Sequence, residues 1–218
     1  MKKLYAIVFM AMIALTTKAF AEMSYGVSAA LTKIDATGTE TEGGETTDGS
    51  ADNVVVIPSL FVEYAYSDTI SIGLDYIPLS ADVSDKTKKR TDVETSVTGT
   101  ATTTSTSREQ SVQAELDNHI SLYAHYNFND TTYLKVGAVR VDLNTDESLG
   151  TGSKYGNETL NGGLIGIGAQ SGNSRFEVVY TDYEDVSLKS SVARTGVTTN
   201  NKIDADLDTI AFKYSYAF

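Results

Sequence analysis

Cysteine and tryptophan are absent from this 218-residue sequence, and proline occurs only twice. Without cysteine, an exported chain must be stable without disulfide bonds. The longest charge-free apolar run, Leu4–Leu15, has 12 residues, whereas a helix needs about 20 residues to cross a bilayer. We therefore expect no transmembrane helix in the mature chain.

Basic residues are also scarce. The chain has 17 Lys and Arg against 29 Asp and Glu, which gives a formal net charge of −12. A chain this acidic is repelled by nucleic-acid phosphates and by anionic lipid headgroups. The composition therefore argues against both as general partners.

The N-terminus has the three parts of a secretory signal. Lys2 and Lys3 precede the apolar run, and Ala19, Phe20 and Ala21 form a small-x-small cleavage site. We expect cleavage before Glu22, so that residues 1–21 are a signal peptide and the chain is exported. No cysteine follows the cleavage site, which argues against a lipoprotein.

The last seven residues alternate in character. Phe212, Tyr214, Tyr216 and Phe218 are large and aromatic, and small or polar residues such as Lys213 separate them. Successive side chains of a strand point to opposite faces. A strand with aromatic rings on one face and small or polar groups on the other is typical of a transmembrane β-barrel, where the rings face lipid.

Similar alternation predicts further strands along the chain, separated by short turns and long polar connections in alternation. The predicted strands are 24–35, 53–66, 70–77, 112–128, 132–143, 163–170, 176–183 and the C-terminal segment. The short turns are 67–69, 129–130 and 172–173, and the long connections are 36–52, 81–108, 144–162 and 184–201. Pro58 implies a bulge or an unpaired position, since proline lacks an N–H donor.

Two segments leave alternatives open. Residues 81–108 are dense in Thr, Ser and Lys, and form either a long mobile loop or a tall hairpin extension. For strand 132–143 we expect Leu134, Val136 and Ala138 to face outward, although a bulge could instead turn the later residues Val139, Val141 and Leu143 outward.

Short turns at one rim and long loops at the other are the outer-membrane pattern. The sequence therefore predicts an all-β protein, an eight-stranded antiparallel up-and-down transmembrane β-barrel spanning residues 22–218.

The signal, the eight amphipathic strands, the alternating loop lengths and the Tyr214-x-Tyr216-x-Phe218 ending together resemble the small outer-membrane barrels of the OmpA/OmpX and opacity-protein type. The resemblance implies a bacterial outer-membrane location. It also implies that the strand carrying Phe212, Tyr214, Tyr216 and Phe218 is the signal read by the barrel assembly machinery. Larger OmpA-like members carry a peptidoglycan-binding domain after the barrel, and that activity is not implied here.

Several ionisable side chains are predicted to point into the barrel. The interior of an eight-stranded barrel is just wide enough for side chains to fill. We expect these residues to form a neutralising plug, since unpaired charges there would be costly, with a narrow ion or water path as the alternative. They are Glu63, Asp75, Glu115, His119, His125, Lys135 and Glu177.

A second acidic set shares parity with lipid-facing residues near the outer rim. Its members are Asp182, Glu184, Asp204, Asp206 and Asp208. Because a carboxylate in hydrocarbon is costly, we place the bilayer boundary near Tyr180 and Ile210. The acids would stand at headgroup height, either as a solvated strand extension or sharing Mg²⁺ or Ca²⁺ with lipopolysaccharide phosphates.

Enzyme sites are not supported. Ser121, His119 and His125 lie on one strand, where each two-residue step is about 7 Å by strand rise, too far for a hydrogen-bonded triad. Asp142-x-Asn144-x-Asp146 resembles the start of a calcium loop but lacks its later glycine and acid.

The sequence thus predicts a monomer without cofactor or metal, embedded in outer-membrane lipid and lipopolysaccharide. Its role would be structural or a loop-mediated surface interaction. A small ion-conducting porin is the alternative, although aqueous pores generally need more strands. A soluble lipocalin-like carrier would have an apolar cavity and a polar outside, which is the reverse of the pattern in this sequence.

Overall fold

The computed structural model describes residues 23–42, 45–98, 102–148, 154–191 and 200–218. The expected signal peptide, residues 1–21, lies outside these ranges. In the described part of the chain there is no helix long and apolar enough to cross a membrane.

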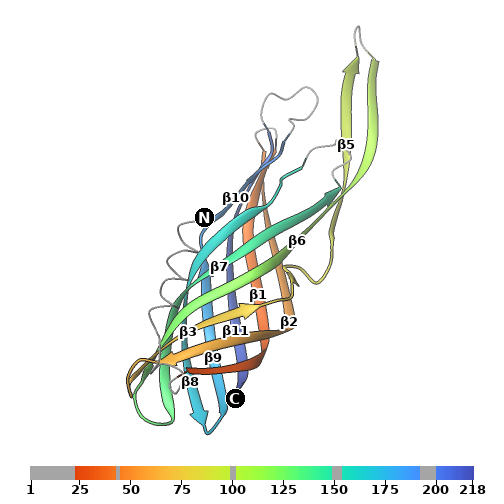
Figure 1. Cartoon of the computed structure of the whole chain (residues 1–218). Coiled ribbons are helices and arrows are strands. Elements are labelled where there is room, and N and C mark those ends of the chain that lie inside the picture. The colour runs from red at the N-terminus through yellow and green to blue at the C-terminus, as the bar shows by residue number, and fades with distance from the viewer. Residues whose placement is uncertain (1–22, 43–44, 99–101, 149–153, 192–199) are drawn as a thin grey trace.

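Eight antiparallel strands form a closed ring in the order β1-β2-β3-β6-β7-β8-β9-β11, and β11 pairs with β1 to close it (Figure 1). This is the predicted fold, an eight-stranded up-and-down barrel. The ring strands are β1 (Met23–Glu42), β2 (Glu45–Ala65), β3 (Ile70–Ile77), β6 (Thr102–Asn127), β7 (Thr132–Ser148), β8 (Glu158–Ser171), β9 (Ser174–Tyr183) and β11 (Lys202–Ala217). Three further strands, β4 (Ala81–Asp82), β5 (Lys88–Thr98) and β10 (Val186–Lys189), pair with ring strands.

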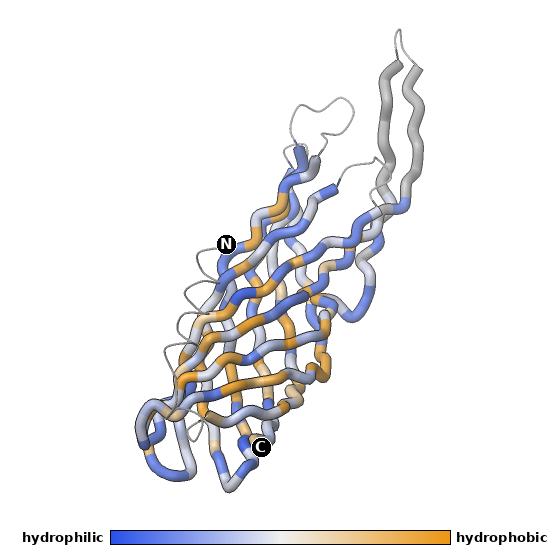
Figure 2. The backbone as a smooth tube through the Cα atoms, in the orientation of Figure 1, coloured by the Kyte–Doolittle hydropathy of each residue, from blue (hydrophilic) through white to orange (hydrophobic). Residues whose placement is uncertain are grey.

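Alternation along the strands separates an apolar outer wall from the interior. In β7, Lys135 and Val139 are buried while Val136 and Ala138 are exposed, so the chosen register of strand 132–143 is right and the alternative bulge is absent. Figure 2 shows hydrophobic residues concentrated in the barrel wall and hydrophilic residues prevailing at the short turns. The wall is therefore suited to lipid.

Several segments expected as loops are paired strand. The hairpin of β1 and β2 continues through residues 36–42 and 45–52 in unbroken register. Residues 81–108 hold β4, β5 and the start of β6, so the hairpin extension is present in place of a mobile loop. Threonine-rich segments favour extended backbone, and pairing satisfies their backbone hydrogen bonds. Pro58 sits in regular register without a bulge, where β2 does not yet pair with β3.

A bulge in β6 makes part of the predicted set of inward residues wrong. The pairing of β6 with β7 shifts between Asp117 and Ile120, and Asn118 has φ 52°. Asparagine tolerates this left-handed conformation better than most residues. The extra residue reverses the parity of the strand before it. As a result Leu116 is buried in the interior, and Glu115, expected inside, lies on the opposite face.

Candidate functional site: the barrel interior

A bidentate ion pair crosses the interior between β2 and β9. Arg175 donates to both carboxylate oxygens of Glu63, from Nη1 to Oε2 at 2.8 Å and from Nη2 to Oε1 at 2.9 Å. The hydroxyl of Tyr123 donates to Oε2 of Glu63 at 3.2 Å. Glu63 is 5% exposed, so its charge depends on these partners and not on water.

A second buried carboxylate, Glu177 on β9, has a matching environment. Lys135 Nζ lies 3.2 and 3.0 Å from its two oxygens, and the hydroxyl of Tyr133 donates to Oε1 at 2.9 Å. The same Lys135 Nζ lies 4.1 Å from the ring centroid of Tyr123, within the range of a cation–π contact.

His125 connects these two groups. Its Nδ1 lies 3.2 Å from Glu63 Oε2, and its Nε2 lies 3.3 Å from Glu177 Oε1. The imidazole is placed between two tilted rings, with centroids 4.8 Å from Tyr123 and 4.2 Å from Tyr133. These two ring contacts hold the imidazole in the interior, where His125 is buried.

A third ion pair completes the set. Lys213 on β11 donates to the carboxylate of Asp75 on β3, and Ser59 Oγ donates to the same carboxylate at 3.2 Å. Three carboxylates thus face three basic side chains. We call these six charged residues and His125 the plug: Glu63, Asp75, His125, Lys135, Arg175, Glu177 and Lys213.

The plug leaves almost no free volume. The cavity among its residues is about 10 Å³, close to the minimum that holds one water molecule. Balanced charge and dense packing thus narrow the lumen at this level.

Two glycines make room for the aromatic rings of the plug. A Cβ built on Gly73 of β3 would lie 2.2 Å from the Tyr123 ring, and one on Gly168 of β8 would lie 2.3 Å from the Tyr133 ring. Each ring covers the glycine that is paired with it on the neighbouring strand. The inward glycines therefore set the position of both rings, and through them that of His125.

Sequence reasoning identified part of this arrangement. Five of the seven predicted lumen residues lie in the plug, namely Glu63, Asp75, His125, Lys135 and Glu177. His119 points into a separate cavity, and Glu115 is outside the lumen. Arg175 and Lys213 were missed. Both share inward parity with Glu177 and Ser215, so the alternation that found Glu177 could have found them.

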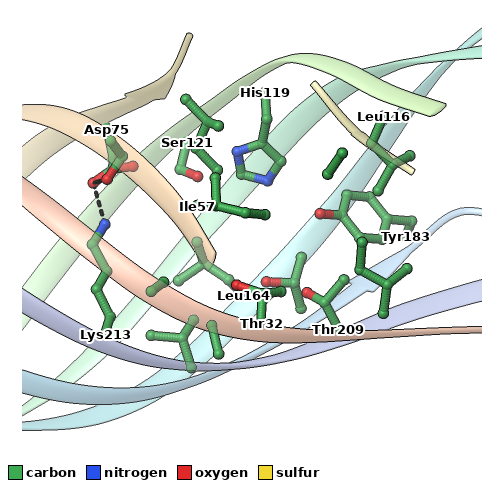
Figure 3. A pocket seen from close by; sticks show the side chains of 18 of the residues that line it. Thr32, Ile57, Asp75, Leu116, His119, Ser121, Leu164, Tyr183, Thr209 and Lys213 are labelled. Atoms are coloured by element: carbon green, nitrogen blue, oxygen red, sulfur yellow. Dashed lines mark hydrogen bonds and ion pairs between the residues drawn. The ribbon is translucent and has the colours of Figure 1, made fainter. Parts of the chain in front are cut away.

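Away from the plug, toward the long extensions, the interior is apolar. Buried aliphatic side chains replace the ion pairs; they include Ile34, Leu143, Leu160, Leu164, Val179 and Leu207. A cavity of about 90 Å³ lies between this layer and the Asp75–Lys213 pair (Figure 3). The lumen thus has two chemically different halves.

The outer-rim acids do not form one cluster. Asp208 lies directly opposite Asp182 on one side and Asp35 on the other. Burial, followed by these two carboxylates, raises the pKa of Asp208 above its ordinary value. Glu184 instead accepts hydrogen bonds from Asn161 at 2.9 and 3.0 Å.

The two remaining rim acids on β11 differ from each other. Asp204 pairs with Lys202 at 2.7 Å, and the hydrogen bond from Lys202 lowers its pKa. Asp206 is exposed.

The aromatic residues of β11 and the residue that follows it, Phe218, lie on the outer wall. Phe212, Tyr214, Tyr216 and Phe218 are between 41 and 63% exposed. The backbone N–H of Phe218 donates to the carbonyl of Tyr25 at 2.9 Å, and the two rings lie 5.8 Å apart. These residues thus cover the seam where the last strand meets the first.

Comparison with known proteins supports the fold. No family model matches the chain, and no curated protein matches it. Among solved structures, outer membrane protein AlkL in lipid bilayers is 13% identical, with 90% of each chain covered and a TM-score of 0.53. Neisserial surface protein A is 14% identical, covering 89% of this chain and 97% of that one, with a TM-score of 0.44. Ail of Yersinia pestis is 12% identical, covering 86% and 98%, with a TM-score of 0.29. These structural neighbours are outer-membrane β-barrel proteins, and the likeness to AlkL shows a shared barrel fold.

Proposed function

We propose that this protein is a non-catalytic bacterial outer-membrane barrel that acts through a surface interaction made by its long β5–β6 hairpin. The observation that carries the proposal is the length of this hairpin. β5 and the first part of β6 pair over Lys88–Thr98 and Thr102–Val112 and project well beyond the ring (Figure 1). A barrel that only sealed the membrane would not need this extension.

The hairpin offers an open sheet edge. Within the described residues, β5 pairs with β6 alone. The free edge of a strand presents backbone N–H and C=O groups to which a partner strand can add. Its sequence carries Lys and Arg next to Asp and Glu, mixed with Thr and Ser. Charged side chains on an edge disfavour uncontrolled pairing with other sheets, which favours a selective contact.

The interior argues against the channel alternative. Ions would have to pass the plug, where the remaining cavity is about 10 Å³ and each charge already has a partner. We therefore expect reconstituted protein to give no steady single-channel conductance in planar bilayers. Regular conductance steps in the wild-type protein would instead support a small channel.

The location can be tested on intact cells. Trypsin should cut the β5–β6 hairpin at one of its basic residues, Lys88, Lys89, Arg90 or Arg108, and leave a protected barrel fragment in the outer-membrane fraction. Full protection of the hairpin in intact cells, combined with cutting after lysis, would mean that it lies on the periplasmic side, and this would contradict a surface interaction.

The interaction is tested by removing the hairpin alone. Replacing residues 88–110 by a short Gly-Ser turn should keep a folded barrel, seen as a gel shift between unboiled and boiled samples. Attachment of cells to one another and to a protein-coated surface should fall. A matched variant that shortens the β1–β2 hairpin across residues 40–47 serves as the control. Equal attachment by wild type and both variants would refute a role for the β5–β6 hairpin.

The assembly and lipid partners follow from the same proposal. We infer insertion by the barrel assembly machinery, lipid and lipopolysaccharide around the apolar wall, and a monomeric state. The closed ring supports the last point, because no ring strand is left without a neighbour along the apolar wall.

A further inference from the structure

The chain has two prolines, and the fold brings both to one place in the barrel wall. Each ring strand keeps two neighbours, but the pairing of β2 with β3 ends at Leu60 opposite Tyr76. Continued by two residues, this register would place Pro58 directly opposite Pro78. Opposite residues of an antiparallel ladder exchange both N–H···O bonds or neither, and proline has no N–H to donate. The ladder therefore stops at this point.

The segment that follows β3 leaves the regular ladder as well. Ile77 lies opposite His119 on β6, and Ala81 lies opposite Leu116. Three residues, 78–80, thus face only two on β6. An extra residue on one strand disrupts pairing locally and bends the strand, so this segment does not continue along β2.

β2 meets the chain again nearer to the outer rim. Asn53 Nδ2 donates to the carbonyl of Asp82 at 2.8 Å. Between this contact and the end of the ladder, residues 54–59 of β2 have no strand partner on the side of β3. We call the space between them and residues 77–81 the wall gap. Its cavity has a volume of about 300 Å³.

The wall gap is lined from both faces of β2. Val56 and Pro58 are exposed on the outer wall, whereas Ile57 is buried. Ile57, Leu79 and Ala81 also line the inner cavity of about 90 Å³, in which Figure 3 shows Ile57. These three side chains therefore form the boundary between the wall gap and the inner cavity.

The wall gap opens toward lipid near the outer rim. Val54 lies opposite Lys33 of β1, which lies opposite Ile210 of β11, and the bilayer boundary is expected near Ile210. Val56, two residues nearer to the plug, is 71% exposed. At membrane depth, unpaired backbone groups are costly unless they face protein or water. An occupant with a polar part would satisfy these groups, whereas a purely apolar one would not.

The lining of the wall gap restricts the class of ligand. It is polar at the rim end, where Asn53 and Asp82 lie, and apolar toward Ile57 and Leu79. The exposed carboxylate of Asp82 repels an anionic head group and accepts hydrogen bonds from a donor. A cavity of roughly 150 Å³ holds a benzene molecule, so the wall gap has room for an alkyl chain of several carbon atoms.

We propose that the wall gap binds a single-chain amphipathic molecule with a hydroxyl or ammonium head, taken up from the outer half of the bilayer. The head donates hydrogen bonds at the rim end, beside Asn53 and Asp82. The alkyl chain packs against Val56 and Leu79, and its end reaches the inner cavity past Ile57. This site is independent of the hairpin and its surface interaction.

Photolabelling tests the site. The probes are decanol and decyl phosphate, each with a diazirine at the end of the alkyl chain, so that they differ in the head group alone. The protein is irradiated with each probe in phosphatidylcholine nanodiscs, and the labelled residues are identified by mass spectrometry. With the decanol probe, saturable labelling is expected at Ile57 and Leu79, and an excess of unlabelled decanol should remove it.

The second probe tests the head group. Labelling of Ile167 on the outer wall reports how much of each probe is dissolved in the bilayer, and the other signals are divided by it. On this scale the decyl phosphate probe should label Ile57 and Leu79 less than the decanol probe. Asp82→Asn removes the repelling charge and should raise the labelling by decyl phosphate.

Gap-filling variants separate the site from the bilayer. Ala81→Leu enlarges a buried side chain that borders both cavities and should abolish the saturable labelling. Ala138→Leu makes the same change on the exposed face of β7 and should leave it intact. The gel shift on boiling reports folding of each variant; should Ala81→Leu fail to fold, Ser80→Phe fills the gap from an exposed position.

Three results would overturn the proposal. The first is labelling that unlabelled decanol does not remove and that is spread over lipid-facing residues such as Ile167, which would mean that the probe only dissolves in the bilayer. The second is persistence of the saturable labelling in the folded gap-filling variants. The third is equal labelling of Ile57 and Leu79 by the two probes in the wild-type protein.

Discussion

The carboxylate of Glu63 and the guanidinium of Arg175 meet across the lumen from β2 and β9, in a bidentate pair with distances of 2.8 and 2.9 Å. The two residues lie 112 positions apart in the chain, and their strands are not neighbours in the ring. The pair therefore joins opposite walls of the barrel, in addition to the backbone ladders that join adjacent strands.

Breaking this pair should destabilise the barrel. Arg175→Met leaves Glu63 buried and undercompensated, which typically costs about 3–5 kcal/mol. Lys135→Met should act the same way through Glu177. Urea unfolding in detergent, followed by the gel shift on boiling, measures the loss as a lower midpoint.

Two controls identify the cause. The double variant Glu63→Leu/Arg175→Met removes both charges and should recover much of the stability, because apolar replacements of buried pairs are often tolerated. Lys33→Met breaks an exposed pair with Asp35 and should change little. An unchanged midpoint in Arg175→Met would mean that the lumen is wet and open.

The close approach of Gly73 to Tyr123 gives a second prediction. Gly73→Ala places a methyl group where the Tyr123 ring lies, and such overpacking costs about 1–3 kcal/mol. Gly163→Ala is the matched control, because a Cβ there meets nothing within 4 Å. Equal unfolding midpoints for the two variants would show that the ring can move away freely.

The alternation of side chains was enough to predict the ring of eight strands and the inward orientation of Lys135 and Glu177. It failed where the period of two was interrupted. The bulge at Asn118 leaves no mark on the hydrophobicity pattern. Leu116 and Ile120 are both apolar and share parity in the sequence, as they would on one face of a regular strand. Only the pairing with β7 shows that one of them faces inward.

The length of the strands was missed for a different reason. Residues 36–52 are rich in Gly, Thr and Glu and show no alternation, since both faces of this hairpin lie beyond the apolar wall. Backbone pairing holds such segments together without an apolar face, and single-sequence patterns do not record pairing. Arg175 could have been predicted from the alternation of side chains, since it shares the parity of Glu177.

The contact between Phe218 and Tyr25 gives a third prediction. Phe218→Ser removes a ring at the β1–β11 seam and part of the proposed assembly signal, so the amount of folded protein in the outer membrane should fall. Phe128→Ser removes an outward ring of similar exposure, 58% against 63%, away from this seam. Quantitative blotting of unboiled membrane samples measures both. An equal loss in the two variants would mean that lipid contact alone matters and that Phe218 carries no signal.

The carboxylates around Asp208 give a prediction about pH. Because the folded-state pKa of Asp208 is raised, ionising this group costs more in the folded barrel than in the unfolded chain. Its penalty is absent below the unfolded pKa, grows as pH rises through the folded pKa, and is complete at neutral pH. Asp208→Asn should therefore raise stability at pH 7 and have little effect at pH 3. A gain of the same size at both pH values would contradict the electrostatic cause.

The level of the bilayer boundary is the last prediction, and it depends on two neighbouring rows of outward side chains. Lys33, Ile210 and Tyr180 lie side by side on β1, β11 and β9, and the next outward row along these strands holds Asp35, Asp208 and Asp182. Lys33 reaches up to Asp35 at 2.6 Å, as a lysine does when its stem lies along an apolar surface.

A carboxylate in the hydrocarbon is costly, so the boundary should fall between these two rows. Nitroxide labels at Phe212 and Asp206, on the same face of β11, should differ sharply. The label at Phe212 should be relaxed by oxygen dissolved in lipid, and the label at Asp206 by a water-soluble nickel chelate. Labels at Val178 and Asp182 on β9 should repeat the contrast, since Val178 lies opposite Phe212 and Asp182 opposite Asp208. If Asp206 proved as accessible to oxygen as Phe212, the membrane would extend further along the strands, and the row of aspartates would have to be neutralised within it.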